Sequence, residues 1–262
     1  MMRWQVDLKY KKALVTGGTR GLGKVVAELF TSKGIDVVTC SRGKQDTPNH
    51  YQCDVSSAWT VSRMIKDHQD LDIIVCNAGI YGPIGPLETI KPDNWKQTIE
   101  VNLMGVVNVC RFAVPILKAN GKGKIIILSG GGATQPMPNF SAYAASKAAV
   151  VRFGETLAEE LREFNIDVNC VAPGSLNTDF MEQAIAAGPE LAGQSFYDRM
   201  IKQQQEGGAD INIAAELCYF LASEQSDGLT GKLVAAQWDD WKNMDKYNTT
   251  GDLYTLRRVN KQ

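Results

Sequence analysis

The sequence predicts an α/β fold in which about seven parallel strands form a doubly wound sheet with helices on both faces. Short runs rich in Val and Ile alternate with longer segments of helical periodicity. A glycine-rich turn follows the first of these runs. The chain has 262 residues and 44% hydrophobic content, enough to bury both faces of such a sheet.

The strand candidates are short and almost continuously apolar, which is typical of parallel strands buried on both faces. They are Lys12–Thr16, Asp36–Cys40, Leu71–Cys76, Lys124–Ser129 and Ile166–Val171, with weaker candidates at Tyr51–Cys53 and Lys232–Ala236. The helix candidates are Leu22–Ser32, Ala58–Lys66, Asn94–Lys118, Ala142–Phe164 and Ile213–Leu221. This alternation predicts βαβ units. Ligands of such sheets bind at the carboxyl ends of the strands.

We expect one domain over residues 1–241, followed by a polar, loosely held tail at 242–262. Residues 43–50 are polar and contain Pro48, so we expect a loop there in place of a helix. Residues 175–208 show no strand pattern but contain Phe180, Met181, Phe196 and Tyr197. These side chains fit either a lid over the substrate or a helical hairpin packed on the sheet.

Composition excludes several classes of protein. A formal net charge of -1 without long charge runs gives no surface for nucleic acid or an anionic membrane. No apolar run reaches the roughly 18 residues that span a bilayer, and the first residues lack a signal-peptide pattern. The six cysteines are scattered, which favours a reducing cytoplasmic location. With two histidines and no ligand cluster, we expect no metal site.

The segment Thr16–Gly23 follows a strand and opens a helix, which is the context of a phosphate-binding glycine loop. Gly17, Gly21 and Gly23 allow a tight turn and bring backbone N–H groups close to a pyrophosphate. The alternative is that these glycines serve only the turn.

The end of the second strand indicates which dinucleotide binds. A carboxylate there would hold the ribose of NAD, but this chain reads Thr39-Cys40-Ser41-Arg42. Arg42, together with Arg20 from the glycine loop, suits a 2′-phosphate. The sequence therefore favours NADP, the alternative being that both arginines are ordinary surface residues.

Tyr143 and Lys147 are four residues apart on a predicted helix and so share one face. A fixed ammonium beside a phenol lowers the phenol's pKa and makes it a usable proton donor or acceptor.

These motifs, in this order, resemble the single-domain short-chain dehydrogenase/reductases, whose fold is of the Rossmann type. The resemblance runs from Lys12 to Leu233. It includes the glycine loop, Asp54-Val55, Asn77-Ala78-Gly79, Asn102, the Tyr143/Lys147 pair, and Pro173-Gly174 with Thr178. It implies an NADP(H)-dependent oxidoreductase that interconverts a ketone or aldehyde with an alcohol, and assembly as a homodimer or homotetramer.

The resemblance also implies residue roles. Tyr143 exchanges the proton with the substrate oxygen, Lys147 holds the nicotinamide ribose, and Asn102 holds a water that links Lys147 to solvent. Asp54 accepts from the adenine amino group, although it, like Asn102, fits a local capping role as well. The implied cofactor-binding residues are Gly17, Thr19, Arg20, Gly21, Leu22, Gly23, Ser41, Arg42, Asp54, Val55, Asn77, Ala78, Gly79, Tyr143, Lys147, Pro173, Gly174 and Thr178.

One position departs from the family pattern. The family has a catalytic serine thirteen residues before the tyrosine, and here that residue is Gly130. Ser129 is the first candidate to replace it, Thr134 and Ser141 are others, and backbone N–H groups of the glycine run are a further possibility. If none serves, the chain is a catalytically weak NADP-binding sensor or scaffold.

The substrate end is less informative. The run Trp238-Asp239-Asp240-Trp241 suits a sugar-like or polyol substrate, since indole faces stack on C–H groups and carboxylates accept from hydroxyls. The same residues suit a subunit interface equally well. Transient hydride transfer in a sugar-nucleotide epimerase is a further alternative function.

Overall fold

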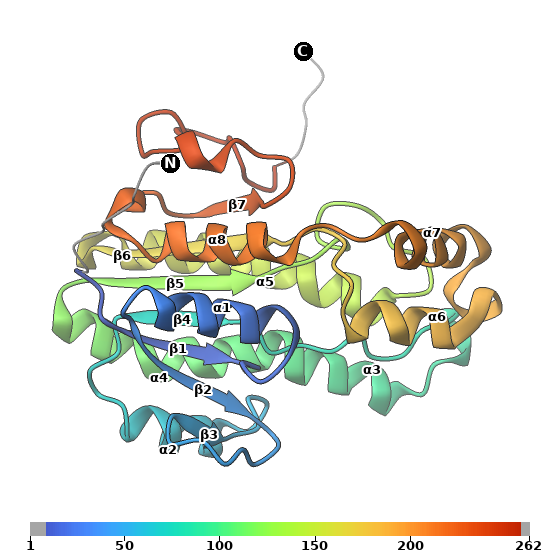
Figure 1. The fold of residues 1–262 in the computed structure, drawn as a ribbon, viewed down its shortest axis with the longest axis horizontal. Coiled ribbons are helices and arrows are strands. Elements are labelled where there is room, and N and C mark those ends of the chain that lie inside the picture. Colours follow the sequence, from blue (N-terminus) through green and yellow to red (C-terminus); the bar gives the residue numbers. More distant parts are fainter. Residues whose placement is uncertain (1–8, 258–262) are drawn as a thin grey trace.

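The computed structural model describes residues 9–257 and places a seven-stranded parallel sheet at the centre of one domain (Figure 1). The strand order is β3-β2-β1-β4-β5-β6-β7, which confirms the predicted doubly wound sheet. The strands are β1 (Lys12–Thr16), β2 (Asp36–Ser41), β3 (His50–Gln52), β4 (Ile73–Cys76), β5 (Gly123–Leu128), β6 (Ile166–Ala172) and β7 (Lys232–Ala235).

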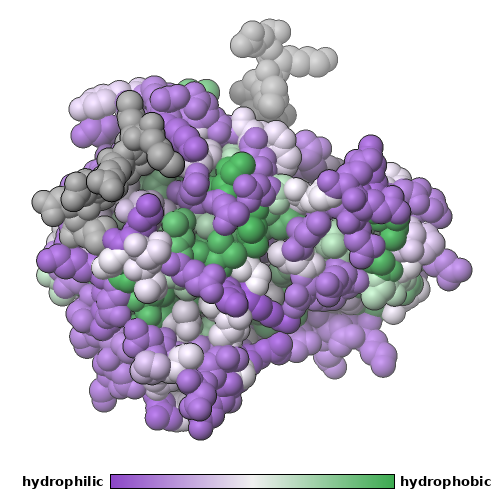
Figure 2. Space-filling model, in the orientation of Figure 1, coloured by the Kyte–Doolittle hydropathy of each residue, from purple (hydrophilic) through white to green (hydrophobic). Residues whose placement is uncertain are grey.

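Helices cover both faces of the sheet. One apolar cluster joins the sheet to α1 and α8, and a second joins it to α2, α4 and α5. The helices are α1 (Gly21–Ser32), α2 (Ala58–Lys66), α3 (Pro92–Ile99), α4 (Gly105–Asn120), α5 (Ser141–Leu161), α6 (Asp179–Ala192), α7 (Gln194–Glu206) and α8 (Ile211–Leu221). Short helical turns lie at η1 (Leu87–Thr89), η3 (Arg162–Phe164), η4 (Glu224–Ser226) and η5 (Trp241–Asn243). Figure 2 shows apolar side chains gathered over α1 and α8 within a mostly hydrophilic surface.

The crossover between β1 and β4 positions the site. β1 pairs with β2 on one side and with β4 on the other, so the chain connections leave this point in opposite directions. The loops after these strands diverge and leave a crevice at their carboxyl ends. Thr16 fixes the crevice, because its Oγ1 accepts hydrogen bonds from the backbone N–H groups of Asn77 and Ala78, both at 3.0 Å.

The helix predicted over Asn94–Lys118 differs in one detail. A π-helical turn, η2 (Glu100–Met104), joins α3 to α4 and contains Asn102. By length and composition alone, the continuous segment 92–120 could cross a membrane. In the fold it packs against the sheet as a core helix, with Val106, Val109 and Leu117 buried.

The segment 175–208 forms the hairpin of α6 and α7, which turns at Gly193. Gly188 interrupts α6 with a φ of 75° directly before Pro189, a backbone conformation that glycine adopts without strain. As predicted, residues 43–49 form a loop between β2 and β3.

The tail after Trp241 is held more firmly than its polar composition suggests. Leu233 donates from its backbone N–H to the carbonyl of Tyr254 at 2.7 Å, so the tail runs beside β7. The Lys232 ammonium donates to the carbonyls of Gly251 and Leu253. These main-chain bonds, which composition does not count, hold the tail against β7. Residues 258–262 of the predicted tail lie outside the described residues.

Candidate active site

A cavity of about 1090 Å³ lies along the carboxyl ends of the strands. All of the predicted cofactor-binding residues line it except Gly23. Gly23 instead allows close packing, because a Cβ there would lie less than 3.0 Å from the Asn77 side chain and the Gly17 carbonyl. The glycine loop, the ends of β2 and β4, and the start of α5 therefore face one space.

The glycine loop has the conformation that an anion site needs. Gly17 has a φ of 65° and donates from its backbone N–H to the carbonyl of Cys40 at 2.8 Å. No side chain caps the N-terminus of α1, and its first turn carries no acidic residue. The N-terminal N–H groups and the helix dipole are thus left for a negatively charged ligand.

Asn77 supports this loop from β4. Its side-chain amide donates to the carbonyls of Thr16 and Gly17, at 2.9 and 3.2 Å. Asp54 also lines the cavity, while its Oδ1 accepts from both the backbone and the hydroxyl of Ser56. Ser57, not Asp54, caps the N-terminus of α2, so the capping role considered for Asp54 is wrong.

Ser41 and Arg42 reach the cavity at the end of β2, and a histidine that the sequence analysis did not single out lies beside them. The ring of His50 contacts the Thr39 hydroxyl through Nδ1 at 3.1 Å and the Ser41 hydroxyl through Nε2 at 3.2 Å. Pairing of Thr39 with His50 between β2 and β3 produces this contact. In the sequence, only the short connection between β2 and β3 indicated that His50 would lie beside the end of β2.

Arg20 lies at the mouth of the cavity and pairs with the carboxylate of Asp179, in the first turn of α6. The pair links the glycine loop to the α6–α7 hairpin. Both side chains are substantially exposed, at 68% and 48%. Sequence reasoning assigned Arg20 to a phosphate and missed its carboxylate partner, because 159 positions separate the two residues.

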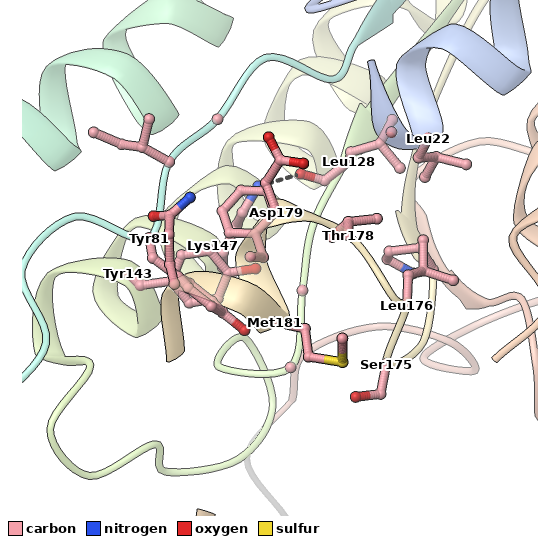
Figure 3. Close-up of a pocket in the computed structure, with 18 of the residues that line it drawn as sticks. Leu22, Tyr81, Leu128, Tyr143, Lys147, Ser175, Leu176, Thr178, Asp179 and Met181 are labelled. Atoms are coloured by element: carbon pink, nitrogen blue, oxygen red, sulfur yellow. Dashed lines mark hydrogen bonds between the residues drawn. The ribbon is translucent and has the colours of Figure 1, made fainter. Parts of the chain in front are cut away.

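Tyr143 and Lys147 lie together on α5, as predicted from their spacing (Figure 3). Both residues are buried. The Lys147 ammonium donates to the carbonyl of Leu128 at 2.7 Å and lies 5.7 Å from the centre of the Tyr143 ring. Burial lowers the pKa of Lys147 to about 8. Burial, with a smaller contribution from Tyr81, raises the pKa of Tyr143, opposite to the lowering expected from its spacing to Lys147, so the phenol keeps its proton at neutral pH.

Asn102 lies directly behind this pair, and its side chain clamps the loop after β4. Its Oδ1 accepts from the backbone N–H of Ile80 at 2.8 Å. Its Nδ2 donates to the Ile80 carbonyl and to the Ser146 hydroxyl, each at 2.9 Å. Both amide hydrogens are used in these bonds, which match the local backbone role that the sequence left open.

Gly130 faces the phenol of Tyr143 directly. A Cβ at this position would lie less than 3.0 Å from the Tyr143 hydroxyl oxygen. Ser129 also lines the cavity, but it is buried and its hydroxyl donates to the Lys147 carbonyl at 3.4 Å. This contact argues against the catalytic role expected for Ser129.

The other two hydroxyl candidates do not line the cavity. Thr134 is exposed and does not line the cavity. Ser141 accepts a hydrogen bond from the indole N–H of Trp95 at 3.1 Å. Of the three candidates only Ser129 lines the cavity, and its hydroxyl is bonded to the Lys147 carbonyl.

The hairpin roofs the cavity. Phe180, Met181, Phe196 and Met200 line it together with Tyr81. Amide side chains supply a polar wall, from Gln135, Asn139, Gln183, Gln194 and Gln203. The hairpin and the lid that the sequence left as alternatives are thus one element.

The four residues of the run 238–241 do not all face the cavity. Trp238 is 74% exposed and lines the cavity, whereas Trp241 is buried and donates to the carbonyl of Ala236. Asp239 accepts from the backbone N–H of Ala235, and Asp240 from the Asn243 amide. Neither carboxylate lines the cavity, so of this run only Trp238 lies where a hydroxylated ligand would contact it.

The described part of the chain holds no cluster of metal-ligating side chains. A glycine loop at the strand crossover and a buried tyrosine–lysine pair define the class as a dinucleotide-dependent oxidoreductase. The family model for short chain dehydrogenase matches residues 11–188. The chain belongs to this family.

Relatives within the family differ in substrate. The chain is 33% identical to 3beta-hydroxysteroid dehydrogenase 1 of Eggerthella lenta, over 86% of this chain and 91% of that protein. It is 30% identical to L-fucose dehydrogenase of Oryctolagus cuniculus, over 82% and 80%. The structure of gluconate 5-dehydrogenase from Burkholderia cenocepacia, in complex with NADP and tartrate, superposes with a TM-score of 0.76 at 27% identity, over 86% and 92%.

Proposed function

We propose that this protein is an NADP(H)-dependent oxidoreductase that interconverts a ketone or aldehyde with an alcohol. One observation carries the proposal. The buried Tyr143–Lys147 pair lines the same cavity as a glycine loop and Arg42. A proton-transfer group and an anion cradle in one cavity suit a reaction that moves a hydride and a proton together.

The residues at the cofactor end fit NADP. The uncapped N-terminus of α1 accepts a pyrophosphate, and Ser41 and Arg42 line the place of a 2′-phosphate with donors in place of a carboxylate. Arg20 is a further cation at this end once it leaves Asp179. The NADP-bound gluconate 5-dehydrogenase supports the same choice of cofactor.

When bound, the nicotinamide supplies or accepts a hydride. Tyr143 donates its proton to the substrate oxygen during reduction and takes it back during oxidation. Lys147 is held by the Leu128 carbonyl, and its ammonium stabilises negative charge that develops on the phenol. Asn102 acts by fixing the backbone at Ile80.

We propose a sugar-like or polyol substrate. Tyr81, Phe180 and Phe196 give the cavity an aromatic lining, and the amide side chains described above line it as well. Aromatic faces stack on the C–H groups of a sugar, and amides both donate to and accept from its hydroxyls. Relatives named for L-fucose and for gluconate support this substrate class. The relative named for a 3beta-hydroxysteroid supports a steroid as the competing class.

We further propose self-association as a homodimer or homotetramer through the outer side of η2 and α4. Met104 is 37% exposed there, and Leu103 and Phe112 are partly buried beside it. Met104→Glu places a charge on this face. Sedimentation should show a smaller species for the variant than for the wild type, and an unchanged distribution would remove the proposed interface.

The experiment is a panel of aldoses, aldonates, keto-acids and ketosteroids, measured by NADPH oxidation or NADP reduction. We expect turnover with a hydroxylated substrate, and Tyr143→Phe should reduce it by at least about a hundredfold. NADPH binding without turnover of any panel member would favour the sensor or scaffold. Product formed without net change in the cofactor would favour the epimerase.

A further inference from the structure

Substrate orientation needs a hydrogen-bond donor beside Tyr143, and Gly130 has no side chain to supply it. We propose that the hydroxyl of Tyr81 is this donor, and that it binds the substrate carbonyl oxygen together with Tyr143. This inference rests on the proposed function, which it extends by naming a second catalytic residue.

The first support is the position of Tyr81. Its ring lies against the Tyr143 ring, with centroids 4.7 Å apart and planes at 82° (Figure 3). Both residues line the cavity. Tyr81 comes from the loop after β4 and Tyr143 from the first turn of α5, so two different elements bring the two phenols into one cavity.

The second support is that the ring is fixed from several sides. Tyr81 packs against Phe180 with centroids 4.7 Å apart and against Phe140 at 5.2 Å. The residue before it, Ile80, is held by both polar atoms of the Asn102 side chain. The residue after it, Gly82, has a φ of 71° and lies against Thr98 too closely to carry a Cβ. A donor held in this way loses little entropy when it binds substrate.

The third support is the state of the two hydroxyls. Among residues 9–257, neither phenol hydroxyl has a hydrogen-bond partner. In the same part of the chain, every side-chain oxygen sealed from solvent has one. Both hydroxyls therefore open into the cavity. Burial raises the pKa of Tyr81 to about 12, so this phenol keeps its proton at neutral pH and donates.

The chemistry balances without a further reactant. In reduction, hydride reaches the carbonyl carbon from the cofactor, and the C=O π pair becomes a lone pair on oxygen. Tyr143 transfers its proton to that oxygen. Tyr81 donates a hydrogen bond throughout and keeps its proton, so it stabilises the developing charge as an oxyanion-hole donor does.

The test is Tyr81→Phe, which removes the hydroxyl and keeps the ring that packs on Phe180 and Phe140. We expect kcat to fall about 10²–10³-fold while KM changes little, because the bond strengthens in the transition state. Tyr219→Phe on α8 is the matched control, and NADPH affinity measured by fluorescence should be unchanged in both variants. Tyr143→Phe, measured in parallel, tests the proposed function separately.

A second measurement does not depend on turnover. Isobutyramide carries a carbonyl that a hydride does not reduce, and calorimetry of the NADPH complex gives its affinity. We expect Tyr81→Phe to weaken this binding about fivefold, the size of one neutral hydrogen bond.

Two results would overturn the role of Tyr81. One is a Tyr81→Phe variant with kcat within threefold of the wild type while Tyr143→Phe is inactive. This would leave the proposed function standing and point to backbone donors of the glycine run. The other is equal isobutyramide affinity in wild type and variant, or no binding by the wild type. If the wild type turns over no carbonyl, the proposed function fails, and the amide measurement still decides whether Tyr81 binds a carbonyl.

Discussion

Gly130 and Tyr143 compete for one volume, because a Cβ on residue 130 would lie less than 3.0 Å from the tyrosine hydroxyl oxygen. In the family pattern a serine stands at this position and assists the tyrosine. Here the phenol occupies the space into which that serine would project. The absence of a side chain at Gly130 therefore leaves room for the Tyr143 hydroxyl.

The first prediction concerns this shared volume. Gly130→Ala should displace the Tyr143 hydroxyl and lower kcat about a hundredfold, since small misplacements of a reacting group carry costs of that order. Gly130→Ser should not raise activity, although it restores the family residue, because its Cβ meets the same obstacle. Steady-state kinetics on the best substrate of the panel measures both effects.

Gly131→Ala is the matched control, because a Cβ there meets nothing within 4 Å. It should keep near wild-type kinetics and stability, whereas overpacking at residue 130 should lower the free energy of unfolding by about 1–3 kcal/mol. An active Gly130→Ser enzyme would show that the phenol moves freely out of this space.

The second prediction concerns the pair of Arg20 and Asp179. Asp179→Asn should tighten NADPH binding, because the Arg20 guanidinium no longer has to leave a carboxylate. Both groups are exposed, so the gain should be small, up to about fivefold. Fluorescence titration at low salt measures it, and added salt should reduce the difference.

Glu182→Gln removes a carboxylate from the same helix without touching Arg20 and serves as the control. Equal NADPH affinity in Asp179→Asn and Glu182→Gln would mean that Arg20 does not contribute to phosphate binding. Arg20→Met should then leave the affinity unchanged as well.

The third prediction concerns cofactor choice at the end of β2. Ser41→Asp places a carboxylate beside His50 and Arg42, where it accepts from ribose hydroxyls and repels a 2′-phosphate. The ratio of NADPH to NADH affinity should fall at least about tenfold, or about 1.4 kcal/mol. Ser32→Asp on α1 makes the same change in net charge away from the cavity and serves as the control. An equal shift of the affinity ratio in both variants would contradict the assignment of Ser41 to the 2′-phosphate site.

Sequence patterns predicted the sheet and its helices because these elements depend on local periodicity. β1 and α2 begin and end at the predicted residues, and the other strands differ by at most two residues at either end. The predicted cofactor residues converge because parallel strands bring their carboxyl ends together. The Tyr143–Lys147 pair follows from helix geometry alone.

The rest depended on distances between segments far apart in the sequence. Nothing near Gly130 indicates that a phenol fills its space, and nothing near Arg20 indicates a carboxylate from α6. The clamp of Asn102 on Ile80 arises where η2 passes the loop after β4. Contacts of this kind are tertiary, and a single sequence carries no pattern for them.

The fourth prediction follows from the burial of Lys147. Burial lowers its pKa from 10.5 to about 8 in the folded chain, so the unfolded chain binds more protons between these two values. The contribution of Lys147 to the free energy of unfolding therefore rises as pH increases from 8 to 10.5. It is constant below pH 8. Charging the buried ammonium below pH 8 costs at most about 3 kcal/mol by this linkage.

Lys147→Met removes the titration and keeps most of the side-chain volume. The free energy of unfolding of the wild type minus that of Lys147→Met should therefore increase between pH 8 and 10.5, measured by urea denaturation at fixed ionic strength. Lys66→Met, at an exposed position on α2, should give a difference that is flat over the same window. Other groups that titrate at high pH cancel in both differences. A flat curve for Lys147→Met would mean that this lysine keeps its proton throughout, and that its ammonium stays charged beside Tyr143 even in alkaline solution.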